Sequence, residues 1–227
     1  PEDRPALQAR WEEGVRGLLL AAAPGSDHQL TFARAYAYAA VSDEALTEVA
    51  GLLDGSFTVD GLDVDQDLRW ALLTALAAAG RVGDAEIDAE LERDRSISGQ
   101  ESAAGARAAQ PTAEAKDAAW TAIMDPATPN ETAFSMVLNV FRACPPELAT
   151  AYVDTWLDAA EKAIDVLGFH KASNALEYGF PLPAASPEVL SRVDSWLAST
   201  SAPASAKRYA AEARAEMARA LTAQQTR

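Results

Sequence analysis

The sequence predicts an all-α fold of about a dozen helices joined by short loops, and three observations support it. Alanine, leucine, glutamate and arginine, which are strong helix formers, dominate nearly every segment. Clusters of the β-branched residues that favour strands are scarce. Proline and glycine recur along the chain, where they can end one helix before the next begins. Because no strands alternate with these helices, a parallel α/β sheet or an α/β barrel has no support.

The first half of the chain is expected to form six helices. The first ends at "PGSD", after which Ser26 or Asp27 caps a helix that carries "TFARAYAYAA". Ser42 caps the third helix, and Asp67 begins the fourth, which Gly80 ends. The segment "SISGQ" should then break the chain before a short alanine-rich helix that ends near residue 109. The other expected ranges are 5–23, 42–53, 67–79 and 84–95.

The second half is expected to form six more helices. Pro111 or Thr112 starts the first of them, and Asn130 caps the second. Pro146 suits the first turn of a long helix, because a proline there has no backbone amide to leave unpaired. Pro187, directly after Ser186, suits another helix start in the same way. The expected ranges are 112–124, 130–142, 146–167, 171–178, 187–198 and 204–223.

The spacing of apolar residues suggests how these helices stack. The helix over 67–79 carries two apolar stripes, and a helix that is apolar on two sides is buried between neighbours. The stripes are Leu68, Leu72, Ala75, Leu76 and Ala79, and Trp70, Leu73 and Ala77. Helix pairs recur roughly every 35–45 residues, which favours a right-handed α-α superhelix, a HEAT-like solenoid. We expect residues 1–227 to form a single helical domain, although the lack of a strict internal repeat leaves a compact irregular bundle open.

Charge and cysteine content restrict the partners. The formal net charge of −15 repels phosphate backbones and anionic lipid, so we expect neither nucleic acid nor membrane as a partner. The single cysteine, Cys144, permits no disulfide within the chain and fits a cytoplasmic location. No apolar run approaches the roughly 18 residues that span a membrane. Because the chain begins with Pro1 rather than methionine, we expect a fragment of a longer protein.

The chain offers little catalytic chemistry. A zinc-peptidase helix needs two histidines four residues apart, but the only histidines, His28 and His170, lie far apart in sequence. Cys144 precedes two prolines and is interpreted as a buried residue at a helix end, with no pattern that supports a dyad with His170. No nucleophile elbow and no phosphate-binding glycine loop is present. We therefore expect no catalytic and no metal-binding residue in this chain.

The segment "GLDVDQDLRW" has two interpretations. Asp63, Asp65 and Asp67 alternate like the first ligands of a calcium loop, but such a loop needs glycine at position 6 and glutamate at position 12. Those positions hold Leu68 and Thr74, so calcium binding fails. The aspartates instead suit a helix start, where Asp67 would be the N-cap. The negative charges of Asp63 and Asp65 would interact favourably with the positive end of the helix dipole.

Two stretches carry a family resemblance. "LLDGSFTVDGLDVDQDLRWALLTALAAAG" and "IDAELERDRSISGQESAAGARAAQPTAEAKDAAW" resemble the C-terminal domain of bacterial aminopeptidase N, of the actinobacterial type. The segments "MDPATPNETAFSMVLNVF", "ELATAYVDTW" and "YGFPLP" fit the same domain, which is similar to the C-terminal domain of endoplasmic-reticulum aminopeptidases. The matched residues are Gly55, Gly61, Leu62, Asp65, Asp67, Leu68, Arg69, Trp70, Arg93, Asp94, Gly99, Pro111, Thr112, Lys116 and Trp120.

The resemblance implies a function for the parent protein. It would be a cytoplasmic zinc aminopeptidase that removes N-terminal residues from peptides, with its zinc in a catalytic domain that precedes this chain. In that family the helical domain covers the catalytic domain and encloses a chamber that admits peptides and excludes folded proteins. The implied partners are the catalytic domain of the same polypeptide and peptide substrates, and this fragment alone would be inactive.

Two basic residues inside the matched motifs, Arg69 and Lys116, are the candidates for binding a peptide C-terminus, because a carboxylate pairs well with a cation. The structural alternative is that Arg69 pairs with Asp65, four residues earlier on the same helical face. Two other functions stay open. One is a stand-alone HEAT-like protein-interaction scaffold, and the other is a small-molecule enzyme that uses carboxylates borne on helices.

Overall fold

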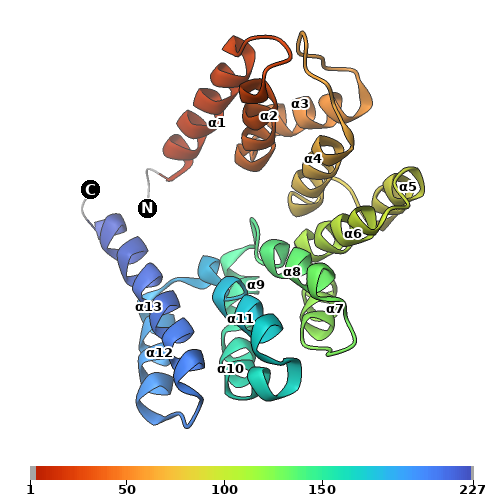
Figure 1. Cartoon of the computed structure of the whole chain (residues 1–227). Coiled ribbons are helices and arrows are strands. Elements are labelled where there is room, and N and C mark those ends of the chain that lie inside the picture. Colours follow the sequence, from red (N-terminus) through yellow and green to blue (C-terminus); the bar gives the residue numbers. More distant parts are fainter. Residues whose placement is uncertain (1–3, 226–227) are drawn as a thin grey trace. The chain divides into compact units, whose positions relative to one another are not determined.

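The computed structural model describes residues 4–225, and within that range it contains helices and no strand, which confirms the predicted all-α class (Figure 1). The elements are α1 (Arg4–Ala21), α2 (Asp27–Ala39), α3 (Asp43–Asp54), α4 (Gln66–Ala78), α5 (Asp84–Arg93), α6 (Ile97–Ala109), α7 (Ala113–Ile123), α8 (Asn130–Asn139), α9 (Pro146–Ala151), α10 (Val153–Leu167), α11 (Phe169–Tyr178), the 3-10 helix η1 (Leu182–Ala184), α12 (Pro187–Ser199) and α13 (Ala204–Gln225). Several sequential pairs pack against each other, as the predicted solenoid requires: α1 with α2 and α3 with α4 in the first compact part of the chain, and α7 with α8, α10 with α11 and α12 with α13 in the second.

Four helix starts follow the sequence prediction closely. The hydroxyl groups of Ser26, Ser42, Thr112 and Ser186 each accept a hydrogen bond from the backbone N–H three residues later. Each of these residues is in extended backbone conformation, as an N-cap requires. Short polar side chains therefore set these boundaries locally, and that is why the sequence alone could place them.

Other boundaries differ from the prediction. The segment "SISGQ" does not break the chain, because α6 already begins at Ile97. The Ser96 hydroxyl accepts the backbone N–H of Gly99 at 3.0 Å and thus starts that helix. The long helix expected over 146–167 is two helices, α9 and α10, which meet at Tyr152. Asn130 is the first residue of α8 rather than its cap, since Pro129 precedes it with no side-chain hydrogen bond.

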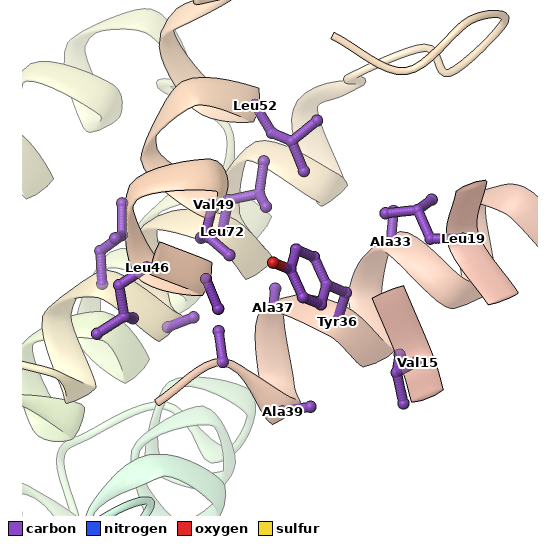
Figure 2. Close-up of a cluster of buried hydrophobic side chains, with 14 of the residues drawn as sticks. Val15, Leu19, Ala33, Tyr36, Ala37, Ala39, Leu46, Val49, Leu52 and Leu72 are labelled. Atoms are coloured by element: carbon purple, nitrogen blue, oxygen red, sulfur yellow. The ribbon is translucent and has the colours of Figure 1, made fainter. Parts of the chain in front are cut away.

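The chain divides into two compact units, Pro1–Ala106 and Arg107–Arg227. The predicted single domain over 1–227 stays a prediction. In the first unit the main core gathers side chains from α1, α2, α3 and α4. Figure 2 shows the ring of Tyr36 in this cluster, with Val49 and Leu72 on neighbouring helices. The Tyr36 hydroxyl donates to the Glu48 carboxylate at 2.6 Å, and Arg16 also pairs with Glu48.

Helix α4 lies between two apolar clusters, as its two stripes predict. Leu68, Leu72, Ala75 and Leu76 belong to the main core of the first unit. Trp70, Leu73 and Ala77 belong to a smaller cluster with Ile87 of α5 and with Ala103 and Ala106 of α6. Ala79, which the prediction placed in the first stripe, lies just after the helix and is exposed.

The second unit has its own core. Trp156 of α10 is fully buried, and its ring meets that of Phe180 edge-on at 5.0 Å between centroids. Helices α8 and α10 both pack against α11, and α12 packs against α13. Tyr209 and Met217 of α13 are buried, so one face of this last helix joins the core while the other faces solvent.

Candidate functional site

The three alternating aspartates near α4 serve the start of that helix. Asp65, not the predicted Asp67, is the N-cap, and its carboxylate accepts the backbone N–H of Leu68 at 2.7 Å. The predicted N-cap was two residues too late, because the helix begins at Gln66 and Asp67 lies inside its first turn. There the negative charge of Asp67 still interacts favourably with the positive end of the helix dipole. Among residues 4–225, no group of three or more metal-ligating side chains is arranged to hold an ion.

Arg69, the first candidate for peptide binding, is paired inside the fold. Its Nε and Nη2 donate to the two carboxylate oxygens of Glu90 on α5, at 2.7 and 2.6 Å. Its Nη1 donates to the backbone carbonyl of Leu53, at the end of α3, at 3.0 Å. The expected pairing of Arg69 with Asp65 was wrong, because the carboxylate of Asp65 accepts the backbone N–H of Leu68 at the start of α4. Arg69 therefore ties α3, α4 and α5 together, and the paired carboxylate raises its pKa.

Asp94 is a second matched motif residue whose side chain connects parts of the fold. Its carboxylate accepts the indole N–H of Trp70 at 2.8 Å and the hydroxyl of Ser96 at 2.5 Å. These hydrogen bonds, that of Ser96 above all, lower the pKa of Asp94, which is buried. A side-chain carbon added at Gly99 would lie 2.6 Å from the carboxylate of Asp94 and would also overlap its backbone carbonyl. The "RD…G" pattern thus fixes how α5 turns into α6.

Lys116, the second candidate, is fully buried in the second unit. Its Nζ donates to the backbone carbonyls of Ala108 and Ala109, at 2.8 and 3.2 Å. These carbonyls lie in the last turn of α6, where a helix lacks internal partners and favours a positive charge. Burial lowers the pKa of Lys116 to about 8, and the Cys144 thiol lies close enough to oppose that shift. Cys144 is buried just after α8, as the sequence indicates.

Lys171 plays a similar role that the sequence analysis missed. Its buried Nζ donates to the backbone carbonyls of Asp125 and Thr128, at 2.5 and 2.8 Å, and so holds the turn between α7 and α8. A signal was available in the spacing along α11. Lys171 lies four residues before Ala175, so the two residues share one face of α11, and that face is buried. A lysine on a buried face must find its hydrogen-bond partners inside the fold.

A pocket of about 270 Å³ lies beside Arg69 in the first unit, between the end of α3 and the loop that leads to α4. Its lining is mainly apolar, with Asp54, Thr58 and Arg69 as polar members. The apolar lining residues are Leu52, Leu53, Phe57, Val59, Leu62 and Val64. Ligand pockets typically hold about 300–1,000 Å³, so this one suits an apolar side chain better than a whole drug-sized molecule.

Arg69 retains some capacity to bind a ligand at this pocket. A guanidinium has five N–H donors, and three of them donate to Glu90 and Leu53, which leaves two. Its charge is offset by the carboxylate of Glu90, so these donors suit a peptide carbonyl better than they suit an unpaired carboxylate. Lys116 offers no exposed surface to a ligand. The peptide-binding role of both residues stays a prediction.

The lowered pKa of Lys116 makes a testable prediction about stability. In the unfolded chain this lysine ionises near its ordinary value of about 10.4. Between pH 8 and that value the unfolded chain holds a proton that the folded chain has lost, so the free energy of unfolding rises with pH. The full rise from Lys116 amounts to about 3 kcal/mol. Urea denaturation at pH 7 and pH 9.5 should show part of it, and Lys116→Met should abolish that part.

Other groups titrate nearby, so the comparison must be with the variant at each pH. The raised pKa values of Tyr36, Tyr152 and Cys144 lower the stability of the fold in strong alkali, because each would ionise more readily once unfolded. The lowered pKa of Lys171 acts in the same direction as that of Lys116. Tyr36, Tyr152 and Lys171 are present in both proteins and cancel in the difference. Cys144 cancels only in part, because the variant lacks the nearby charge of Lys116, which acts to lower the pKa of that thiol. If the free energy of unfolding changed with pH in the same way in the wild-type protein and in the variant, the lowered pKa of Lys116 would be contradicted.

These contacts define a class of protein: an all-helical domain whose charged motif residues join its own helices. The chain belongs to the family of ERAP1-like C-terminal domains, whose family model matches residues 4–219. It is also 40% identical over 226 residues to aminopeptidase N of Streptomyces lividans, a match that covers 99% of this chain. The family resemblance predicted from the motifs is therefore confirmed. The chain spans about a quarter (26%) of the length of that relative.

Between residues 4 and 225, no helix combines the length and the apolar character that crossing a bilayer demands.

Proposed function

We propose that this chain is the non-catalytic C-terminal domain of an aminopeptidase that removes N-terminal residues from peptides. The observation that carries the proposal is the family match over residues 4–219, together with the 40% identity to an aminopeptidase N of which the chain spans about a quarter. The catalytic zinc would be held by a domain of the same polypeptide outside this chain. The parent would act in the cytoplasm, where the single cysteine would stay reduced.

The domain would act by covering the active site of that catalytic domain. Packed helix pairs would form a stiff wall, and a wall around a distant active site would limit which substrates reach it. Peptides would enter the enclosed chamber, whereas folded proteins would be too large. The contacts described above support this role, because Arg69, Asp94 and Lys116 each fix one helix relative to the next.

The pocket beside Arg69 would contribute to peptide binding. Its apolar lining would accept a side chain from the distal part of a peptide, while the two free donors of Arg69 would hold a backbone carbonyl. Burying one apolar side chain stabilises a complex by about 1.5–3 kcal/mol, which corresponds to at least tenfold in affinity. Lys116 would contribute only by maintaining the fold, since it is fully buried.

Thr58→Trp in the intact enzyme tests this use of the pocket. Thr58 is exposed at the pocket, so an indole there should fill the space without disturbing the core. KM for a peptide long enough to reach this domain should rise about tenfold, while turnover of a short aminoacyl reporter should not change. Thr47→Trp, on exposed surface of α3 and not among the pocket's lining residues, is the matched control. An unchanged KM for long peptides would remove the pocket from the proposal.

A further inference from the structure

Helix α1 exposes a row of large apolar side chains. Leu7, Trp11 and Leu18 are 36%, 58% and 51% exposed. Their spacing of four and seven residues places them on one side of the helix, since each residue advances about 100° around the axis. Gly14 lies in the same row, and a side-chain carbon added there would meet no atom within 4 Å. We call Leu7, Trp11, Gly14 and Leu18 the outer face of α1.

The outer face adjoins the face that α1 already buries. Val15 and Leu19 are buried in the main core of the first unit, where α1 packs against α2. Together the two faces make an apolar sector wide enough for a second neighbour. Helix α4 has the same two-sided pattern and is covered on both sides. A helix of this kind in a solenoid is an internal helix, whereas the described core of the first unit covers α1 on the side of Val15 and Leu19.

The last helix of the chain makes the contrast clear. Terminal repeats of a solenoid need a polar outer face to stay soluble. Helix α13 meets that requirement, because its described residues include no exposed large hydrophobic side chain. Helix α1 exposes four, namely the three of the outer face and Leu20. The polar outer face of a terminal repeat is therefore present at α13 and missing at α1.

We propose that the outer face of α1 is an interface for the helical segment that directly precedes this chain in the intact polypeptide. The inference rests on the proposed function in supposing that the chain is the C-terminal part of a longer enzyme. A domain described as C-terminal has the rest of its polypeptide before it, and about three quarters of the Streptomyces relative lie outside the match. The preceding segment would present an apolar helix face to Trp11 and Leu18, close enough at Gly14 for the helices to touch.

Cysteine labelling in the folded protein tests this interface. Leu18 and Leu20 are exposed to a similar degree, 51% and 47%, but face opposite sides of α1. In the intact enzyme, Leu18→Cys should react with a maleimide at least about tenfold more slowly than in the 227-residue chain. Leu20→Cys should react equally fast in both. Cys144, the only native cysteine of the chain, is buried and gives little background, and peptide mapping by mass spectrometry separates it from any cysteine elsewhere.

Each alternative outcome overturns the proposal. If Leu18→Cys reacts as fast in the intact enzyme as in the 227-residue chain, the outer face is free. If Leu18→Cys is already protected in the 227-residue chain and sedimentation shows a dimer, the occupant is a second copy. The readout does not depend on peptidase activity. An intact protein that protects Leu18→Cys but cleaves no peptide would therefore refute the proposed function and leave this interface standing.

Discussion

Arg69→Met is expected to lower the free energy of unfolding by about 3–5 kcal/mol, the range for removing one partner of a buried ion pair. The variant leaves the buried carboxylate of Glu90 without its two closest donors and the Leu53 carbonyl without its side-chain partner. Arg93 lies 3.7 Å from the same carboxylate, but its side chain is largely exposed and cannot replace a bidentate contact. Urea denaturation followed by circular dichroism measures the change.

Two further variants separate this pair from ordinary surface charge. Arg95 and Glu92 form an ion pair whose side chains are both exposed, so Arg95→Met should cost less than about 1 kcal/mol. The double variant Arg69→Met/Glu90→Met removes both charges of this pair and should be more stable than Arg69→Met alone. If Arg69→Met costs no more than Arg95→Met, then Arg69 does not join the helices, and its availability for a ligand gains weight.

Gly99→Ala is expected to destabilise the fold by about 3 kcal/mol, which combines overpacking with the loss of a buried hydrogen bond. The added methyl group would overlap both the carbonyl and the carboxylate of Asp94. That carboxylate must then move away from the indole N–H of Trp70, a buried donor that would lose its partner. The same denaturation experiment measures this loss.

Gly17→Ala is the matched control. Gly17 lies inside α1, and a side-chain carbon there would meet no atom within 4 Å. Since alanine favours a helix over glycine by about 0.8–1 kcal/mol, this variant should be slightly more stable than the wild-type chain. If Gly17→Ala and Gly99→Ala changed the free energy of unfolding equally, the close packing of Gly99 against Asp94 would be contradicted.

The predictable part of the fold was the local part. Ser26, Ser42 and Thr112 start their helices because a short polar side chain can reach the free amides three residues ahead. The two stripes of α4 were likewise readable, since side-chain spacing alone fixes which residues share a face. The split at Tyr152 was not, because no proline or glycine marks it.

The candidate site was less predictable, because its contacts join residues distant in sequence. The nearest carboxylate to Arg69 by helical spacing is Asp65, yet the observed partner, Glu90, lies 21 residues away. Lys116 likewise reaches carbonyls of another helix. The motifs did identify the family correctly, but their charged residues hold helices together within the chain. The sequence alone offered no means of telling such contacts from ligand binding.

The central claim is that this chain supplies no catalytic group to an aminopeptidase that nevertheless needs it. The direct test compares hydrolysis of a long peptide by the intact enzyme, by the enzyme without residues 1–227, by the 227-residue chain alone and by the two parts mixed. We predict no hydrolysis by the chain alone, impaired hydrolysis without it and recovery on mixing. Hydrolysis by the chain alone, or unimpaired hydrolysis of the long peptide in its absence, would contradict the claim.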